Sequence, residues 1–240
     1  MSETIIRPNY QEVLVPSPGV LLVVTGASGA GKDTLVNTFL QNKTDFHRIV
    51  TYASRPMRPG EQDGVDYNFV SVDRFEEMIA GGELAEYFDY KAEKRLQDPS
   101  VPPDYKGTAR GDFEQVLKGE NVLWRIDPSR AATLEDFFTQ NFEESEARSL
   151  LGATIPIYIA APSDEVLLER IRNRAGDEEF ARMQDTIKSR LDTDTSVWER
   201  NQWAYPNILI NDGTVEQGAV LLDAFMSEHI EYRQQQLQIK

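Results

Sequence analysis

A glycine-rich segment at residues 26–34 constrains the fold of this chain more than any other feature. It reads Gly-Ala-Ser-Gly-Ala-Gly-Lys-Asp-Thr and follows residues 20–25, an apolar run with the composition of a buried parallel strand. A helical pattern continues from about residue 34 to 41. The glycines let the backbone turn so that successive N–H groups point inward, and the helix N-terminus adds partial positive charge. This strand, loop and helix together predict a phosphate-binding loop.

We expect the loop to bind the phosphates of ATP through its backbone N–H groups and its lysine. The contacting residues are Gly26, Ala27, Ser28, Gly29, Ala30, Gly31, Lys32, Asp33 and Thr34. Lys32 supplies a positive charge for the β and γ phosphates; the alternative is a plain glycine turn with a surface lysine. Asp33 stands where this motif usually has Ser or Thr. Its carboxylate either ligates Mg²⁺, directly or through water, or complements the helix N-terminus.

Further apolar segments alternate with helical patterns along the chain. Strands are predicted at residues 84–88, 122–126, 155–160 and 208–210. Helices are predicted at residues 75–79, 113–117, 166–171 and 215–230. This alternation predicts an α/β domain around a mostly parallel sheet.

Some stretches interrupt this rhythm. Residues 1–18 are expected to be an irregular lead-in, and residues 51–70, rich in Arg, Gly and Pro, a separate lobe or irregular sheet. Residues 91–103 have the composition of an exposed loop. Residues 176–182 are charged and begin with glycine, which predicts a mobile flap between two helices.

The composition excludes several classes of protein. With 25 Lys+Arg against 40 Asp+Glu, the net charge is −15, which disfavours nucleic-acid and membrane partners but allows small anionic ligands. The absence of cysteine excludes disulfides, thiol nucleophiles and cysteine-bound metals. No apolar run approaches the roughly 20 residues that span a bilayer, and the start of the sequence lacks a signal-peptide pattern. We therefore expect a cytoplasmic protein, a monomer or homodimer.

A second cluster of charge lies between residues 51 and 70. Arg55 and Arg58 are three residues apart beside prolines, and Tyr67 offers a hydroxyl nearby in the sequence. Arginine forks bind phosphate dianions with charge-assisted hydrogen bonds. Taken alone, the cluster fits an arginine-rich solvated loop equally well.

Together, the phosphate loop and this cluster resemble guanylate kinase, over residues from about 20 to 230. The most specific match is the passage that ends Asp66-Tyr67-Asn68-Phe69-Val70. The resemblance implies a P-loop NTPase fold, with a three-layer α/β/α core, a small GMP-binding lobe and a helical lid. The implied boundaries are a core at residues 19–50, 107–170 and 191–240, a lobe at 51–106 and a lid at about 171–190.

The resemblance also implies a GMP site. Its residues would be Thr51, Arg55, Arg58, Tyr67, Glu86, Lys106, Thr108 and Asp127. Arg55, Arg58 and Tyr67 would hold the phosphate, and Thr51, Glu86 and Thr108 would contact the base. A carboxylate suits guanine because N1–H and the 2-amino group both donate to it. Lys106 replaces a tyrosine of the family that touches the GMP phosphate.

Other positions concern the metal and the transferring phosphoryl group. Asp33 and Asp127 are the expected Mg²⁺ ligands, while Arg125 stands where the family has aspartate. Because Arg125 and Asp127 are two apart on a strand, they should point the same way and are able to pair. The expected catalytic residues are Lys32 and the lid arginines Arg170, Arg174 and Arg190, with Arg182 as a rival to Arg190. Asn211 resembles the adenine-side contact.

These residues predict a kinase that transfers phosphate from ATP to GMP, with dGMP as a further candidate acceptor. A kinase of another phosphorylated acceptor, such as ribose bisphosphate, is an alternative, because Lys106 and Arg125 both depart from the family pattern. A catalytically silent interaction module of the same fold is a further alternative. The basic residues assigned to the site would form one positive cleft inside an acidic surface: Lys32, Arg55, Arg58, Lys106, Arg125, Arg170, Arg174 and Arg190.

Overall fold

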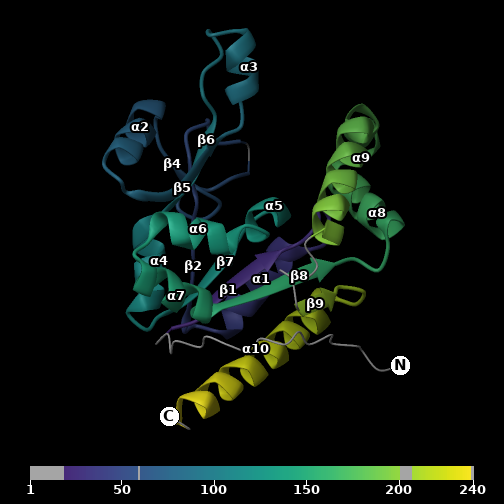
Figure 1. The fold of residues 1–240 in the computed structure, drawn as a ribbon. Coiled ribbons are helices and arrows are strands. Elements are labelled where there is room, and N and C mark those ends of the chain that lie inside the picture. The colour runs from purple at the N-terminus through teal and green to yellow at the C-terminus, as the bar shows by residue number, and fades with distance from the viewer. Residues whose placement is uncertain (1–18, 59, 201–206, 239–240) are drawn as a thin grey trace.

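The computed structural model describes residues 19–58, 60–200 and 207–238, which form a layered core with a smaller lobe above it (Figure 1). The core is a five-stranded sheet in the order β2-β7-β1-β8-β9, and every neighbouring pair is parallel. Its strands are β1 Leu21–Thr25, β2 Phe46–Arg48, β7 Asn121–Arg125, β8 Thr154–Ala160 and β9 Asn207–Ile210. All five residues of β1 are buried, as expected for a central strand covered on both faces.

Side chains of β1 alternate between two hydrophobic clusters. Leu22 and Val24 belong to the cluster that includes α1 Lys32–Asn42 and α10 Val215–Gln238, whereas Leu21 and Val23 belong to the opposite one. The opposite face is covered by α4 Arg110–Leu117, α6 Leu134–Asn141 and α7 Glu144–Ala153. The short helix α5 Pro128–Ala131 follows β7. This is the predicted three-layer α/β/α arrangement around a parallel sheet.

The lobe is a second sheet in the order β4-β3-β6-β5. Its strands are β3 Tyr52–Ala53, β4 Asn68–Phe69, β5 Leu84–Asp89 and β6 Tyr105–Ala109, with β5 and β6 antiparallel. Ser71 is the N-cap of helix α2 Val72–Ala80, and its side chain accepts the N–H of Arg74. The helix buries Phe75 and Met78 against the sheet. The lobe sheet brings together residues that are more than 50 positions apart in the sequence.

Two predictions of irregular structure are wrong. The expected flap at residues 176–182 is helical: Gly176, at φ 82°, separates α8 Asp164–Ala175 from α9 Asp177–Arg200, which starts with three acidic residues. Acidic residues in a first turn stabilise a helix, so the charge marked a helix start and not a flap. Residues 91–103 are largely exposed, as predicted, but their first half is helix α3 Ala92–Gln97 and not a loop. Among the described residues, no helix combines the length and the apolar character needed to span a membrane.

Candidate active site

The glycine-rich loop runs from the end of β1 to the start of α1, and two of its glycines are required by close contacts. A Cβ on Gly26 would lie 2.1 Å from the backbone oxygen of Ile159, and a Cβ on Gly31 would lie 2.5 Å from Nδ2 of Asn211. Both glycines have positive φ, 140° and 89°. The loop is therefore held between β8 and the end of β9, with no room for a side chain at these two positions.

Lys32 lies inside this loop, at the first position of α1. Its Nζ donates to the backbone oxygens of Gly26 at 2.5 Å and Ala27 at 2.7 Å. The ammonium group therefore lies next to the residues that follow β1, beside the N-terminus of α1, where phosphates bind favourably. The predicted phosphate loop and its lysine have the expected context.

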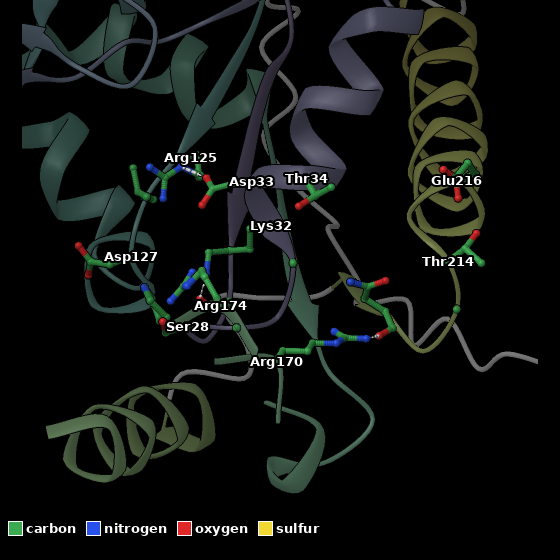
Figure 2. Close-up of a pocket in the computed structure, with 17 residues that line it drawn as sticks. Ser28, Lys32, Asp33, Thr34, Arg125, Asp127, Arg170, Arg174, Thr214 and Glu216 are labelled. Atoms are coloured by element: carbon green, nitrogen blue, oxygen red, sulfur yellow. Dashed lines mark hydrogen bonds and ion pairs between the residues drawn. The ribbon is translucent and has the colours of Figure 1, made fainter. Parts of the chain in front are cut away.

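The loop forms one wall of a cavity of about 730 Å³ (Figure 2). The charged residues of its lining are the cations Lys32, Arg125, Arg170 and Arg174 and the carboxylates Asp33, Asp127 and Glu216. Arg170 and Arg174 reach it from α8, as Figure 2 shows, so two of the predicted lid arginines meet the phosphate loop. The cavity has the size of a small-molecule site and an excess of positive charge.

The other lid candidates differ from these two. Arg182 is exposed on α9 and lies 3.7 Å from Glu179 and 4.0 Å from Glu178, so it belongs to a solvated helix face. It does not line the cavity. Arg190 lies within α9, but its side chain is outside the described part of the structure.

Asn211 fixes the loop from the end of β9. The residue is buried, and its Nδ2 donates to the backbone oxygen of Ala30 at 2.8 Å. Its own backbone oxygen accepts from Arg170 Nη2 at 2.9 Å. Asn211 therefore links the phosphate loop to α8, while its predicted contact with adenine stays a prediction.

Arg125 forms its ion pair with Asp33 and not with Asp127. Nε of Arg125 lies 2.8 Å from Oδ1 of Asp33, and both side chains line the cavity (Figure 2). Asp127 is the N-cap of α5 and accepts the backbone N–H of Arg130 at 3.2 Å. The strand ends after Arg125, so the alternation on which the predicted Arg125–Asp127 pairing rested does not extend to residue 127. Asp33 and Arg125, which both depart from the family pattern, therefore form an ion pair with each other.

A second charged cluster lies in the lobe. Arg55 makes two hydrogen bonds to Glu61, at 2.7 and 2.6 Å, and its guanidinium carbon lies 5.1 Å from the centre of the Tyr67 ring. Lys106 Nζ donates to the Tyr67 hydroxyl at 3.1 Å. Burial alone would raise the pKa of Tyr67, but the charge and hydrogen bond of Lys106, with the charges of Arg125 and Arg55, lower it overall. The positive potential that lowers this pKa is suited to an anion.

Arg58 and Thr51, both predicted to contact GMP, take less part in this cluster. The side chain of Arg58 is exposed, and its backbone N–H donates to Glu61 at 2.8 Å. Thr51 is half-buried just before β3, and its backbone oxygen accepts the N–H of Asn68 at 3.0 Å. Both lie on the same lobe as Arg55.

Glu86 and Thr108, predicted to contact the base, are in direct contact. The buried Thr108 hydroxyl donates to Oε1 of Glu86 at 2.9 Å, across the β5–β6 pair. Oε2 of Glu86 lies 2.9 Å from Nη1 of Arg130 on α5. Burial raises the pKa of Glu86 above 4.5, and the positive charge of Arg130 and the Thr108 hydrogen bond only partly offset it.

Sequence reasoning missed three charged residues of these clusters: Glu61, Arg130 and Arg48. Asp127 followed by Pro128 is the signature of a helix start, and it could have placed Arg130 in the first turn of α5, beside the strand ends. Arg48 ends β2, where burial and the nearby charge of Arg125 lower its pKa. No local signal identifies Glu61 as the partner of Arg55, because the two residues are six positions apart and share no helix or strand.

The expected single positive cleft is divided. Lys32, Arg125, Arg170 and Arg174 line the cavity, whereas Arg55 and Lys106 gather around Tyr67 on the lobe. Arg125 connects the two groups, since it contacts Asp33 and also lowers the pKa of Tyr67.

A parallel α/β sheet with a lysine-bearing glycine loop between its first strand and helix defines a P-loop phosphate-binding protein. Comparisons with known proteins are more specific. A family model described as guanylate kinase matches residues 19–95. Guanylate kinase of Zymomonas mobilis is 34% identical over 219 residues, covering 90% of this chain and 88% of its own length. That of Symbiobacterium thermophilum is 30% identical over 211 residues, covering 88% and 86%.

A solved structure extends the similarity to three dimensions. The crystal structure of guanylate kinase from Anaplasma phagocytophilum matches with a TM-score of 0.57 and 23% identity, covering 88% of this chain and 87% of that one. At this identity the match shows a shared fold. With the sequence relatives, it places the chain in the guanylate kinase family, and the protein is a phosphotransferase.

Proposed function

We propose that the protein transfers the γ-phosphoryl group of ATP in line to GMP, giving ADP and GDP. The observation that carries the proposal is the pairing of two sites across Arg125. One is a phosphate-loop cavity, and the other is a lobe with a cationic cluster and a buried glutamate. The names of the relatives support the choice of acceptor.

On the donor side, the loop N–H groups would hold the ATP phosphates. Lys32 would leave the carbonyls of Gly26 and Ala27 for the β and γ phosphates, and Arg170 and Arg174 would neutralise charge that develops during transfer. Such a reaction needs positioning and electrostatic stabilisation rather than covalent chemistry from the protein.

On the acceptor side, Arg55 and the Lys106–Tyr67 pair would hold the GMP phosphate, with Arg58 and Thr51 nearby. The Glu61 carboxylate already occupies the Arg55 fork, so its two oxygens stand where phosphate oxygens would bind. Glu86 and Thr108 would contact the base.

Two carboxylates fit Mg²⁺. Asp33 and Asp127 both line the cavity, and Mg²⁺ is usually held by one or two carboxylates with phosphate oxygens and water. The described residues contain no cluster of three or more His, Asp or Glu suited to a metal, which agrees with an ion held jointly with the nucleotide. When bound, Mg²⁺ would neutralise phosphate charge. Without the ion, the charge of Asp33 is balanced by its ion pair with Arg125.

Closure would complete the site. The α8–α9 pair, which carries Arg170, Arg174 and Arg190, would act as the lid, and residues 51–106 as the acceptor lobe. Closing both over the nucleotides would exclude water, which otherwise competes as the attacking group.

An acceptor panel tests the proposal. ADP release would be measured with ATP, Mg²⁺ and, in turn, GMP, dGMP, AMP and ribose bisphosphate. We expect turnover with GMP and little with AMP. Turnover with ribose bisphosphate alone would contradict the choice of acceptor, and failure to bind ATP in a titration with and without Mg²⁺ would indicate an interaction module.

A further inference from the structure

The carboxylate of Glu86 is held between donors from two different parts of the chain. Thr108, on β6, donates to Oε1, and Arg130, on α5, lies 2.9 Å from Oε2. Thr108 is fully buried and the Glu86 side chain is 15% exposed, so the carboxylate is fixed in position. A base that binds to Glu86 therefore also meets Arg130.

The guanidinium of Arg130 is itself oriented by its surroundings. Its central carbon lies 5.2 Å from the centre of the Phe88 ring, two residues from Glu86 on the same strand. The Arg130 backbone N–H is held by the N-cap Asp127. The side chain is 33% exposed, and a guanidinium has five N–H donors, of which the ion pair engages Nη1. Donors remain for a second acceptor.

The pair matches the edge of guanine. Along that edge, guanine presents the acceptor O6, the donor N1–H and the donor 2-amino group. Arg130 beside Glu86 presents donors next to a carboxylate. Each carboxylate oxygen has two lone pairs, and Thr108 and Arg130 engage one oxygen each. Adenine would place its 6-amino donor against the Arg130 donors, which is unfavourable.

We propose that Arg130 determines base specificity by donating to O6 of the acceptor guanine, while Glu86 accepts from N1–H and the 2-amino group. This inference rests on the proposed function and adds a residue of helix α5 to the base contacts Glu86 and Thr108, which come from the β5–β6 pair. In protein–DNA complexes the commonest base-specific contact is donation from Arg or Lys to O6 and N7 of guanine, so a guanidinium is a suitable donor to O6.

Calorimetric binding of three nucleotides tests the proposal on the full chain. GMP has both recognition groups, 6-thio-GMP replaces O6 by a weaker acceptor, and IMP lacks the 2-amino group. In Arg130→Ala we expect GMP affinity to fall and the ratio of GMP to 6-thio-GMP affinity to shrink about fivefold. The ratio of GMP to IMP affinity should stay unchanged. The control is Arg74→Ala, which removes an arginine–glutamate pair of the same lobe (Arg74–Glu83, 2.7 Å) and should alter neither ratio.

Each other outcome has a distinct meaning. If the ratio of GMP to IMP shrinks instead, Arg130 acts only through Glu86, and the O6 contact is wrong. If neither ratio changes while the wild type binds and phosphorylates GMP, the inference fails and the proposed function stands. Absence of GMP binding by the wild type overturns both. Arg130→Met keeps an apolar stem against Phe88, and it replaces the alanine variant if circular dichroism shows the latter unfolded.

Discussion

The proposed donor and acceptor sides of the active site are built in different ways. The phosphate-binding part of the donor side is one continuous segment, residues 26–34, whose backbone lies against the ends of β8 and β9. The acceptor side gathers side chains from the lobe strands, the loops between them and α5. A phosphate therefore meets a preformed backbone on one side and a set of paired charges on the other.

The pairing of charges has an energetic consequence. Arg55 is engaged by Glu61, so an acceptor phosphate that binds Arg55 would have to replace the Glu61 carboxylate. Lys32 is engaged by backbone carbonyls, which are neutral. An internal ion pair competes with a ligand more strongly than a neutral carbonyl does. A charged contact in the lobe should therefore contribute less to the free energy of ligand binding than a charged contact in the loop.

The largest effect is expected on the donor side. Lys32→Ala should lower kcat by about 10³-fold, because it removes the mobile charge beside the transferring phosphoryl group. Circular dichroism should show an unchanged fold. The matched control is Lys43→Ala, at the other end of α1, where the lysine pairs with Asp223 at 2.8 Å and kcat should be retained. Retained turnover in Lys32→Ala would sink the kinase mechanism proposed here.

The same contrast explains what the sequence could predict. The donor loop is contiguous, so its glycines, its lysine and its place between strand and helix are visible in the sequence. The core strands at 122–126, 155–160 and 208–210 were also predicted correctly, because the strands of a covered parallel sheet are continuous apolar runs.

What could not be predicted depends on contacts between distant residues. Helices α6 and α7, between β7 and β8, were not predicted; Phe138, Phe142 and Leu150 pack them into the core. The partners of Glu86, Arg55 and Arg125 come from separate elements or irregular backbone. Ion-pair choice depends on final geometry, which neither spacing nor composition encodes.

An intermediate effect is expected where the two sides meet. Arg125→Ala should weaken ATP binding roughly tenfold, since it removes a cation from the cavity and leaves the Asp33 carboxylate unneutralised. Asp33→Asn should strengthen binding of ATP in the absence of Mg²⁺, because it removes a negative charge near the phosphates. The double variant should fall between them. Titration calorimetry with EDTA gives all four affinities.

The outcome with Mg²⁺ sharpens this test. If Asp33 helps hold the ion, Asp33→Asn should lose its advantage, or bind ATP less tightly than wild type, once Mg²⁺ is added. Equal effects of the substitution with and without Mg²⁺ would show that Asp33 serves only as the partner of Arg125. Additive effects of the two single variants would contradict a coupled pair.

The smallest effect concerns Glu61, the internal partner that makes the lobe differ from the loop. The hydrogen bonds of Arg55, with that of the Arg58 backbone, lower the pKa of Glu61 from 4.5 to about 2. A carboxyl whose pKa is lowered in the folded state stabilises the fold above its unfolded pKa, and this contribution is lost as pH falls toward the folded pKa. Glu61→Gln should therefore lower the thermal midpoint slightly at pH 7, with the difference from wild type closing between pH 4.5 and about 2.

The same substitution tests competition within the lobe. If Glu61 occupies the phosphate fork of Arg55, then Glu61→Gln should lower KM for GMP by a few-fold while ATP affinity stays constant, because a neutral amide releases the guanidinium more readily than a carboxylate. Glu77→Gln is the matched control, since Glu77 lies 3.5 Å from Arg74 on an exposed face of the same lobe. A higher KM in Glu61→Gln would mean that Glu61 orients Arg55 toward the acceptor, and the lobe would then be as preformed as the loop.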